Sequence, residues 1–118
     1  MGVYCFRWRR GPWLKVGHYS RGNPWSRVSR RGWRSVVCPD VALGLAGADD
    51  FDLIFWSPAL GRRSERALHS LFPDRFGEWI GAHEEARVLL ELLRMDPDGA
   101  DAAGRCGRAE ANATRRRL

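Results

Sequence analysis

Residues 2–27 read GVYCFRWRRGPWLKVGHYSRGNPWSR, and this stretch decides the fold. Residues 3–8 are rich in aromatic and β-branched side chains and contain neither proline nor glycine, which is typical of a β-strand. A Gly-Pro turn follows, and in residues 13–19 apolar side chains alternate with Lys15 and Gly17, as in a strand with one buried face. Because Gly17 has no side chain to pack, we expect another backbone or a ligand to approach the strand there. The stretch predicts a β-hairpin.

A short helix is predicted directly after the hairpin. Asn23 has the side chain of an N-cap, and Pro24 stands at the first helical position, where its missing N–H costs nothing. The helix is expected to end near Gly32. Three arginines share one of its faces, at positions i, i+3 and i+4: Arg27, Arg30 and Arg31. Such a face either binds an anion or is simply solvated.

The remainder of the chain predicts one further strand and two further helices. Residues 51–56 (FDLIFW) are apolar enough at their centre to be buried on both faces, so this strand belongs in the middle of the sheet or beside the hairpin. Residues 62–72 form a helix that ends at Pro73, and residues 83–95 form an amphipathic helix. The segments between these elements are irregular or extended, namely residues 33–50 and 76–80.

Hydrophobic periodicity assigns a buried face to each of these two helices. The apolar side of the first helix consists of Ser64, Ala67, Leu68 and Leu71. Its opposite side consists of Arg62, Glu65 and His69. The apolar stripe of the second helix consists of Ala86, Leu89, Leu90 and Leu93. Glu65 and His69 are one turn apart, so they either form an ordinary i,i+4 contact or belong to a cleft.

The charge is distributed unevenly along the chain. The formal net charge is +6, yet no acidic residue precedes Asp40. The basic residues before that position are Arg7, Arg9, Arg10, Lys15, Arg21, Arg27, Arg30, Arg31 and Arg34. A basic surface favours polyanionic partners, because neutralising phosphates releases condensed counterions. Nucleic acid is therefore the leading partner class, although a GC-rich coding sequence would also enrich arginine.

Other features of the sequence indicate one intracellular domain. The cysteines, Cys5, Cys38 and Cys106, lie far apart without C-x-x-C spacing, which favours neither a disulfide framework nor a zinc site. The chain has no charged-then-apolar leader and no run of about 18 apolar residues, so we expect a cytoplasmic protein without membrane contact. We expect an ordered domain over residues 1–95 and a flexible basic tail over residues 96–118, which are poor in apolar bulk.

Several short motifs, taken in their order along the chain, resemble the GIY-YIG nuclease superfamily. They are Gly2-Val3-Tyr4, Lys15-Val16-Gly17, Arg27 on the following helix, the E-x-x-L-H run from Glu65 to His69, and the G-E-W-I run from Gly77 to Ile80. The chain is most similar to the branch in which the second signature reads lysine-hydrophobic-glycine, and the resemblance spans residues 2–94. It implies a small α/β sandwich with a three-stranded, mainly antiparallel sheet flanked by helices, in the order β-β-α-β-α-α.

The same resemblance implies a metal-dependent endonuclease that hydrolyses DNA phosphodiester bonds, with RNA as an open alternative. Glu65 would bind one Mg²⁺ or Mn²⁺ per active site, since Mg²⁺ prefers carboxylate oxygen and keeps several waters. Tyr4 would activate or orient the attacking water, with its pKa lowered by Lys15 and Arg27. Arg27 would clamp the scissile phosphate through its rigid fork. We expect Tyr4, Arg27 and Glu65 to surround one cleft.

Further residues complete the expected site. Lys15 occupies the slot of the second-signature tyrosine, and Tyr19 lies on the same side of the strand as the signature glycine and could supply that hydroxyl. His69 would orient a phosphate, assist proton transfer or hydrogen-bond Glu65. The late asparagine of the family has no counterpart, because Asn112 lies in the expected tail. The expected nucleic-acid contacts are His18, Arg21, Arg30 and Arg31.

Two other functions are compatible with the sequence. A non-catalytic nucleic-acid-binding module would keep the fold and the basic surface. A protein-interaction domain would use the six tryptophans as a contact surface, although most of them fall in predicted strands or helix-packing positions, where a role in the core explains them. Substrate preference, biological pathway and oligomeric state are left open.

Overall fold

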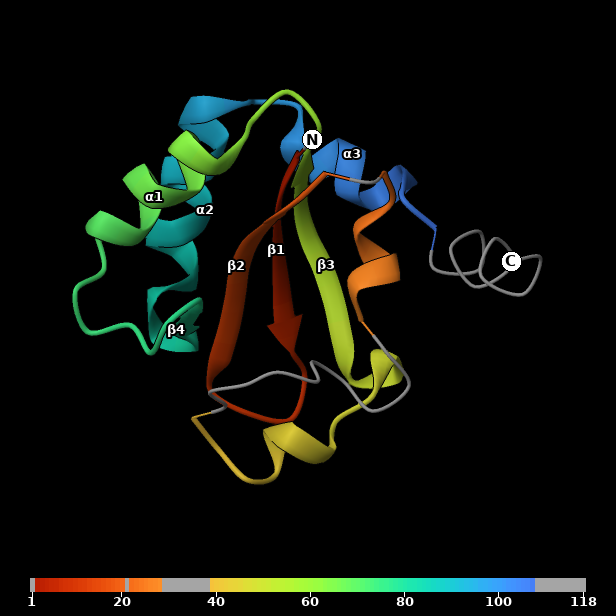
Figure 1. The fold of residues 1–118 in the computed structure, drawn as a ribbon, viewed down its shortest axis with the longest axis vertical. Coiled ribbons are helices and arrows are strands. Elements are labelled where there is room, and N and C mark those ends of the chain that lie inside the picture. The colour runs from red at the N-terminus through yellow and green to blue at the C-terminus, as the bar shows by residue number, and fades with distance from the viewer. Residues whose placement is uncertain (1, 21, 29–38, 108–118) are drawn as a thin grey trace.

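The computed structural model describes residues 2–20, 22–28 and 39–107 of the 118-residue chain. These residues form a small α/β protein, with a four-stranded antiparallel sheet and three α-helices among them. The strands are β1 (Gly2–Trp8), β2 (Trp13–Tyr19), β3 (Phe51–Ser57) and β4 (Trp79–Gly81). The α-helices are α1 (Arg62–Ser70), α2 (Glu85–Met95) and α3 (Gly99–Arg105). Figure 1 shows α1 and α2 next to β2 and β4, with α3 beside β3 on the other side of the sheet.

The predicted hairpin is confirmed and forms the centre of the sheet. The strand order is β3-β1-β2-β4, and β1 pairs antiparallel with β2 from Gly2 opposite Tyr19 to Arg7 opposite Leu14. β3 lies beside the hairpin as predicted, but it is an edge strand. Its residues 52–54 are therefore only half-buried, which corrects the expectation that its centre is buried on both faces.

The segment after the first α-helix, predicted to be a short turn or extended, contains a fourth strand. β4 pairs antiparallel with β2, with Leu14 opposite Ile80 and Lys15 opposite Trp79. A tight turn precedes it, in which Gly77 has a φ of +60°, a conformation that favours glycine. The sequence predicted three strands and the sheet has four. The fourth was missed because a strand of three residues is too short to show a hydrophobic period.

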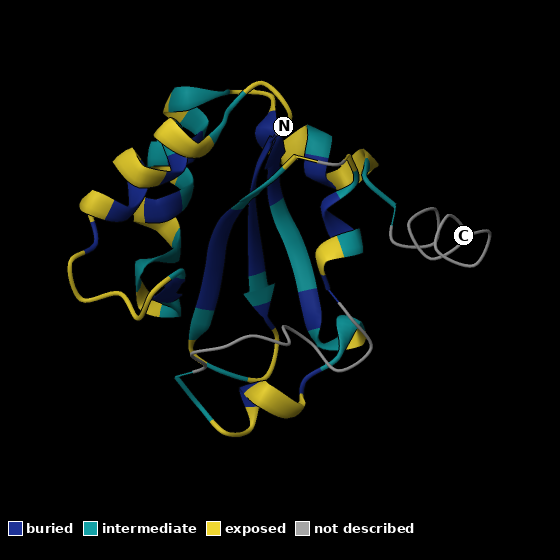
Figure 2. Cartoon of the chain, viewed as in Figure 1, coloured by how far each residue is buried: buried dark blue, intermediate teal, exposed yellow. Residues whose placement is uncertain are grey.

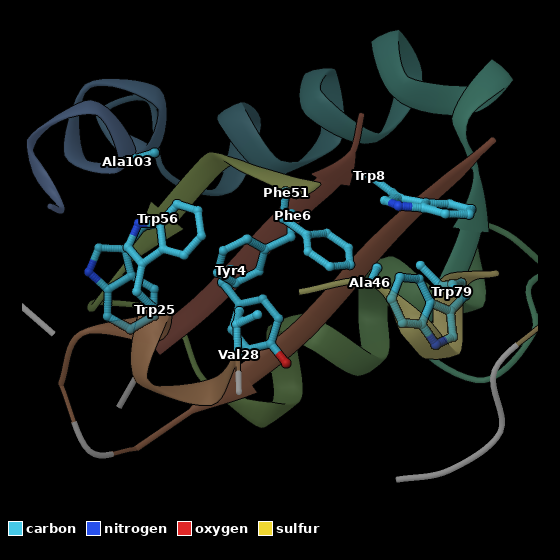
Figure 3. Packing of buried hydrophobic residues seen from close by; sticks show 11 residues of the cluster. Tyr4, Phe6, Trp8, Trp25, Val28, Ala46, Phe51, Trp56, Trp79 and Ala103 are labelled. Carbon is cyan, nitrogen blue, oxygen red and sulfur yellow. The ribbon is translucent and has the colours of Figure 1, made fainter. Parts of the chain in front are cut away.

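The two faces of the sheet have different compositions. The face covered by α1 and α2 is mainly aliphatic and contains Val3, Cys5, Leu14, Val16, Phe55, Leu68, Phe72, Ile80, Val88 and Leu92. The opposite face is mainly aromatic and contains Tyr4, Phe6, Trp8, Trp25, Val28, Leu43, Ala46, Phe51, Trp56, Trp79 and Ala103. Figure 3 shows these rings gathered along one side of the strands. The tryptophans of the described residues therefore pack in or against the core, as the sequence indicates.

The buried face of each long helix overlaps only in part with the predicted one. Leu68 on α1 and Leu89 and Leu93 on α2 pack on the aliphatic cluster as predicted. In α1 the buried residues are Glu65, Leu68 and His69, whereas Leu71, just beyond the helix, is exposed. The prediction was wrong because Glu65 and His69 have hydrogen-bond partners on β2 and can therefore face inward. In α2 the buried residues are Val88 and Leu92, whereas Leu90 is 51% exposed. The run VLLELL offers apolar side chains all around the helix, so periodicity alone does not select its inner face.

The segment after the hairpin forms a single 3-10 turn in the described residues. This turn, η1 (Pro24–Arg27), has Asn23 as its N-cap, whose side chain accepts a hydrogen bond from the Trp25 amide at 2.9 Å, as predicted. The chain is already extended at Val28, so the α-helix expected to run on toward Gly32 is replaced by this turn. Residues 29–38, which include part of the expected irregular connection, lie outside the described residues.

Helix α3 corrects the predicted tail. Residues 96–107 were expected to be irregular because they are rich in small and charged side chains, yet α3 packs on β3 with Gly99 and Ala103 buried. A methyl group on Gly99 would lie 2.0 Å from the Phe55 ring, so the absence of a side chain permits this contact. Small residues indicate close helix packing here rather than loss of structure. Among the described residues, no helix is both long enough and apolar enough to cross a membrane.

Candidate active site

A groove of about 500 Å³ opens where β2 ends. Its lining residues are His18, Tyr19, Ser20, Ser26, Arg27 and Arg62. They come from β2, η1 and α1, which are far apart in sequence, and none of these described lining residues is acidic. Two guanidiniums, an imidazole and several hydroxyls form a surface suited to an anion such as a phosphate group.

Arg27 reaches the groove from η1, and the C-terminal segment holds this turn in place. The Asn23 side-chain amide donates to the Gly107 carbonyl at 3.0 Å, and the Trp25 indole donates to the Cys106 carbonyl at 3.0 Å. Arg27 itself is exposed and forms no ion pair with any carboxylate of the described residues. Its guanidinium is therefore available to an external anion.

Glu65 lies behind the groove wall and contacts His18. His18 Nδ1 donates to Glu65 Oε2 at 2.9 Å, since a carboxylate oxygen accepts, and Arg62 Nη2 lies 3.4 Å from His18 Nε2. Glu65 is only 8% exposed and does not line the groove. The His18 imidazole lies between its carboxylate and the groove. The contact also fixes the orientation of His18 on β2.

The donor set around Glu65 fits a divalent metal held by one carboxylate. Glu65 Oε1 has no hydrogen-bond partner within the described part of the chain. The atom is not fully buried, so it retains some contact with solvent. Mg²⁺ is commonly bound by one or two carboxylates together with substrate phosphate and water. The described residues contain no cluster of three or more His, Cys, Asp or Glu side chains that would bind a metal without such a substrate.

Tyr4 lies beneath the opposite side of β2, across Gly17. A Cβ atom on Gly17 would lie 2.4 Å from Tyr4 Oη and 2.8 Å from Glu78 Oε1. The close approach at this glycine is therefore made by the side chains of Tyr4 and Glu78, and not by the backbone or ligand that the sequence predicts. Lys15 Nζ donates to Glu78 Oε2 at 2.8 Å and lies 4.9 Å from the centre of the Trp79 ring.

The electrostatic surroundings of Tyr4 differ from the prediction. Burial raises the pKa of the Tyr4 hydroxyl far above its ordinary value, and the Glu78 carboxylate raises it further. The Arg27 guanidinium beside the hydroxyl lowers this pKa, but by less. Arg27 therefore acts on this pKa in the predicted direction, but the expectation that the pKa as a whole is lowered was wrong, and Lys15 is not among the groups that shift it most. Lys15 is 7% exposed, and the Glu78 carboxylate balances its charge in an ion pair.

The other predicted site residues fall into three groups. Tyr19 is half-buried, packs against the aromatic cluster and lines the groove. His69 is buried, and its Nε2 donates to the Val16 carbonyl at 2.9 Å, so in this structure it ties α1 to β2. Arg21, Arg30 and Arg31 lie outside the described residues.

The expectation that Tyr4, Arg27 and Glu65 surround one cleft is therefore wrong, because these residues gather in two groups on either side of β2 and only Arg27 lines the groove. Tyr4 stands opposite Gly17 in the sheet and belongs to the aromatic face, whereas Val3 stands opposite His18, which faces α1 and Glu65. Glu65 still raises the pKa of Tyr4, although it is the weakest of the charges that act on it. Arg27 is close to both groups, because it neighbours the Tyr4 hydroxyl and lines the groove beside His18.

Two residues of this region were not assigned a role from sequence. Glu78 was recognised only as a letter of the G-E-W-I run, and Arg62 only as a neighbour of Glu65 on its helix. A signal for Glu78 was present, since a carboxylate directly before the strand paired with Lys15 can reach that lysine. Arg62 precedes Glu65 by three residues, which places both on one side of α1.

Comparison with known proteins does not assign a family to the chain. No protein-family model matches it, and no curated protein or solved structure shows significant similarity.

Proposed function

We propose that this protein is a metal-dependent endonuclease that hydrolyses DNA phosphodiester bonds at the groove beside β2. The observation that carries the proposal is the groove at the end of β2, which Arg27 and Arg62 line beside the His18–Glu65 pair. Arg27 and Glu65 are the residues for which the GIY-YIG resemblance implies phosphate binding and metal binding. Tyr4, for which it implies water orientation, is buried on the other side of β2 and reaches the groove only through Arg27.

The side chains have distinct roles in this proposal. Arg27 and Arg62 bind the non-bridging oxygens of the scissile phosphate, where their guanidiniums form charge-assisted hydrogen bonds. His18 holds the Glu65 carboxylate through Nδ1 and lines the groove beside the phosphate. Tyr4 remains protonated at neutral pH and is fully buried, so it acts as a hydrogen-bonding group that orients Arg27, and not as the base.

Glu65 would hold the metal through Oε1, with Oε2 occupied by His18. A bound Mg²⁺ or Mn²⁺ would supply Lewis-acid polarisation of the phosphate and a more acidic water. The proposed substrate is DNA, with RNA as the competing polyanion.

A non-catalytic nucleic-acid-binding module is the second candidate. The burial of Tyr4 and the pairing of Glu65 with His18 favour it, because neither oxygen-bearing group opens freely into the groove. The basic groove would then bind a phosphate without cleaving the backbone.

Plasmid nicking separates the two candidates. Wild-type protein with Mg²⁺ or Mn²⁺ should convert supercoiled plasmid to the nicked form, and chelation should stop the reaction. Glu65→Gln keeps an oxygen for the His18 hydrogen bond but removes the charge, so nicking should fall at least about 100-fold while DNA binding persists.

The matched control is Glu91→Gln on α2. Glu91 is half-buried and pairs with Arg94, so its replacement removes the same charge at a distance from the groove and should leave nicking unchanged. Binding of DNA without metal-dependent cleavage of DNA or RNA would reject the endonuclease and favour the binding module.

A further inference from the structure

The described arginines and lysine divide into two classes by their partners. Those with a carboxylate within ion-pair distance are Arg7, Arg9, Arg10, Lys15, Arg87 and Arg94. The three arginines on the hairpin are thus balanced by Asp50, Asp52 and Glu85, although no acid precedes them in sequence. The arginines of the hairpin therefore do not form an unpaired positive surface, because carboxylates from later in the chain pair with them.

The described arginines with no described carboxylate in ion-pair distance are Arg27, Arg62, Arg63, Arg66, Arg75 and Arg105, and three of them lie together on α1. Arg62, Arg63 and Arg66 are exposed, and none of them has a carboxylate within ion-pair distance in the part of the chain that the structure describes. At about 100° per residue they fall within about 100° of the helix circumference. The outward face of α1 that carries them is exposed in Figure 2.

This arrangement is electrostatically unfavourable for the helix itself. Arg62 and Arg63 stand at the first two positions of α1, where the positive end of the helix dipole repels cations. No apolar contact explains Arg63 or Arg66, because both are exposed. An external polyanion would remove the mutual repulsion of the three guanidiniums.

Arg62 links this arginine face to the groove. It is one of the groove-lining residues and lies 3.4 Å from His18 Nε2. From Arg62 to Arg66 the helix rises by about 6 Å, which is close to two phosphate steps of one DNA strand, at about 3.4 Å per step along the duplex axis. A strand whose phosphate lies in the groove therefore has its neighbouring phosphates beside Arg63 and Arg66.

We infer that the exposed face of α1, formed by Arg62, Arg63 and Arg66, is the track along which the DNA backbone leaves the groove. This inference rests on the nucleic-acid part of the proposed function but not on cleavage. The contacts are to phosphate, so they bind without base preference and set the position of the strand over the groove. Duplex DNA is the intended occupant.

Binding to a labelled DNA duplex in the presence of EDTA tests the track separately from catalysis. The Arg63→Gln/Arg66→Gln variant should bind about tenfold more weakly at about 0.1 M salt, and the slope of log Ka against log salt should fall in magnitude by about 2. The matched control is Arg87→Gln/Arg94→Gln, which removes the same charge from α2, where both arginines have carboxylate partners. The control should change Kd by less than about twofold, and thermal unfolding should establish that both variants are folded.

Each outcome of this comparison decides the inference. Equal losses in both double variants would mean that only net charge matters and would overturn the track. An unchanged Kd in the α1 variant would also overturn it, as would a loss of binding to RNA duplex but not to DNA duplex. If wild-type protein binds as expected but does not nick DNA, the endonuclease fails while the track stands; if it does not bind at all, both fail.

Discussion

The two sides of β2 bury polar groups in different ways. On the side of α1, the polar groups pair directly with strand partners: Glu65 with His18, and His69 with the Val16 carbonyl. On the aromatic side, the Tyr4 hydroxyl lies deep among rings, next to a lysine-glutamate pair. The first side positions a carboxylate near solvent, whereas the second keeps a phenol dry and protonated.

This difference shows how one strand can support two halves of a site. Side chains alternate along β2, so adjacent positions 17 and 18 serve opposite faces. Gly17 lets Tyr4 pass on one face, and His18 projects toward Glu65 on the other. The halves can therefore be disturbed one at a time by substitution.

The largest effect is expected from filling the space at Gly17. In Gly17→Ala the new methyl group would overlap Tyr4 Oη at 2.4 Å, which requires the ring or the strand to move. The free energy of unfolding should fall by about 1–3 kcal/mol, measured by urea denaturation. Adding Tyr4→Phe removes the closest atom and should recover part of the loss.

Gly104→Ala is the control for this substitution. Its methyl group would meet nothing within 4 Å on α3, so stability should stay level or rise by up to about 1 kcal/mol. Equal destabilisation by both alanines would contradict the close approach of Tyr4 to β2.

An effect of comparable size is expected on the other side, at His18. His18→Ala leaves the buried Glu65 carboxylate without its hydrogen bond, which should cost about 1–3 kcal/mol of stability in thermal unfolding. His18→Asn places an amide N–H near the position of Nδ1 and should restore most of that loss. His83→Ala, at an exposed histidine 3.6 Å from Glu84, is the control and should be nearly neutral. Failure of Asn to outperform Ala would show that the Nδ1 contact does not hold Glu65.

The smallest effect at neutral pH is expected from Tyr4→Phe, which differs from wild type mainly in alkali. Because the pKa of Tyr4 is raised in the folded state, the unfolded chain loses this proton first as pH rises past about 10. Wild-type stability should then fall by about 1.4 kcal/mol per pH unit from this group alone, whereas Tyr4→Phe lacks that contribution. Denaturant unfolding at pH 9 to 11 measures the difference. Parallel pH profiles for the two proteins would mean that Tyr4 is accessible to ionisation when folded.

The hairpin and the N-cap at Asn23 could be predicted because their signals are local. Alternating side chains, a Gly-Pro turn and an Asn-Pro pair each specify backbone conformation within a few residues. β3 was harder, because Ile54 stands opposite no residue of β1 and the pairing shifts between Cys5 and Phe6. This bulge lets the consecutive Ile54 and Phe55 both pack on the aliphatic cluster, which breaks the alternation that sequence analysis relies on.

The candidate site could be predicted as a set of residues but not as a geometry. The motifs include Arg27 and Glu65, which lie in and behind one groove, but Tyr4 is buried on the other side of β2, and the close approach at Gly17 is made by side chains. The inward direction of Glu65 depends on His18, and the raised pKa of Tyr4 depends on burial and on Glu78. These contacts join positions 47 or more residues apart or depend on depth in the core, and no local pattern encodes them.

The hydrogen bonds from Asn23 and Trp25 to the end of the described chain determine where the protein can be cut for laboratory work. A fragment ending at residue 95 would lack the Cys106 and Gly107 carbonyls, and Trp25 would lose its neighbour Ala103 in the aromatic cluster. The Asn23 amide and the Trp25 indole would then lose their hydrogen-bond acceptors, and the turn that carries Arg27 would be held less firmly. A shortened form intended for biochemistry or crystallisation should therefore extend at least to Gly107, and a fused tag is better placed beyond it.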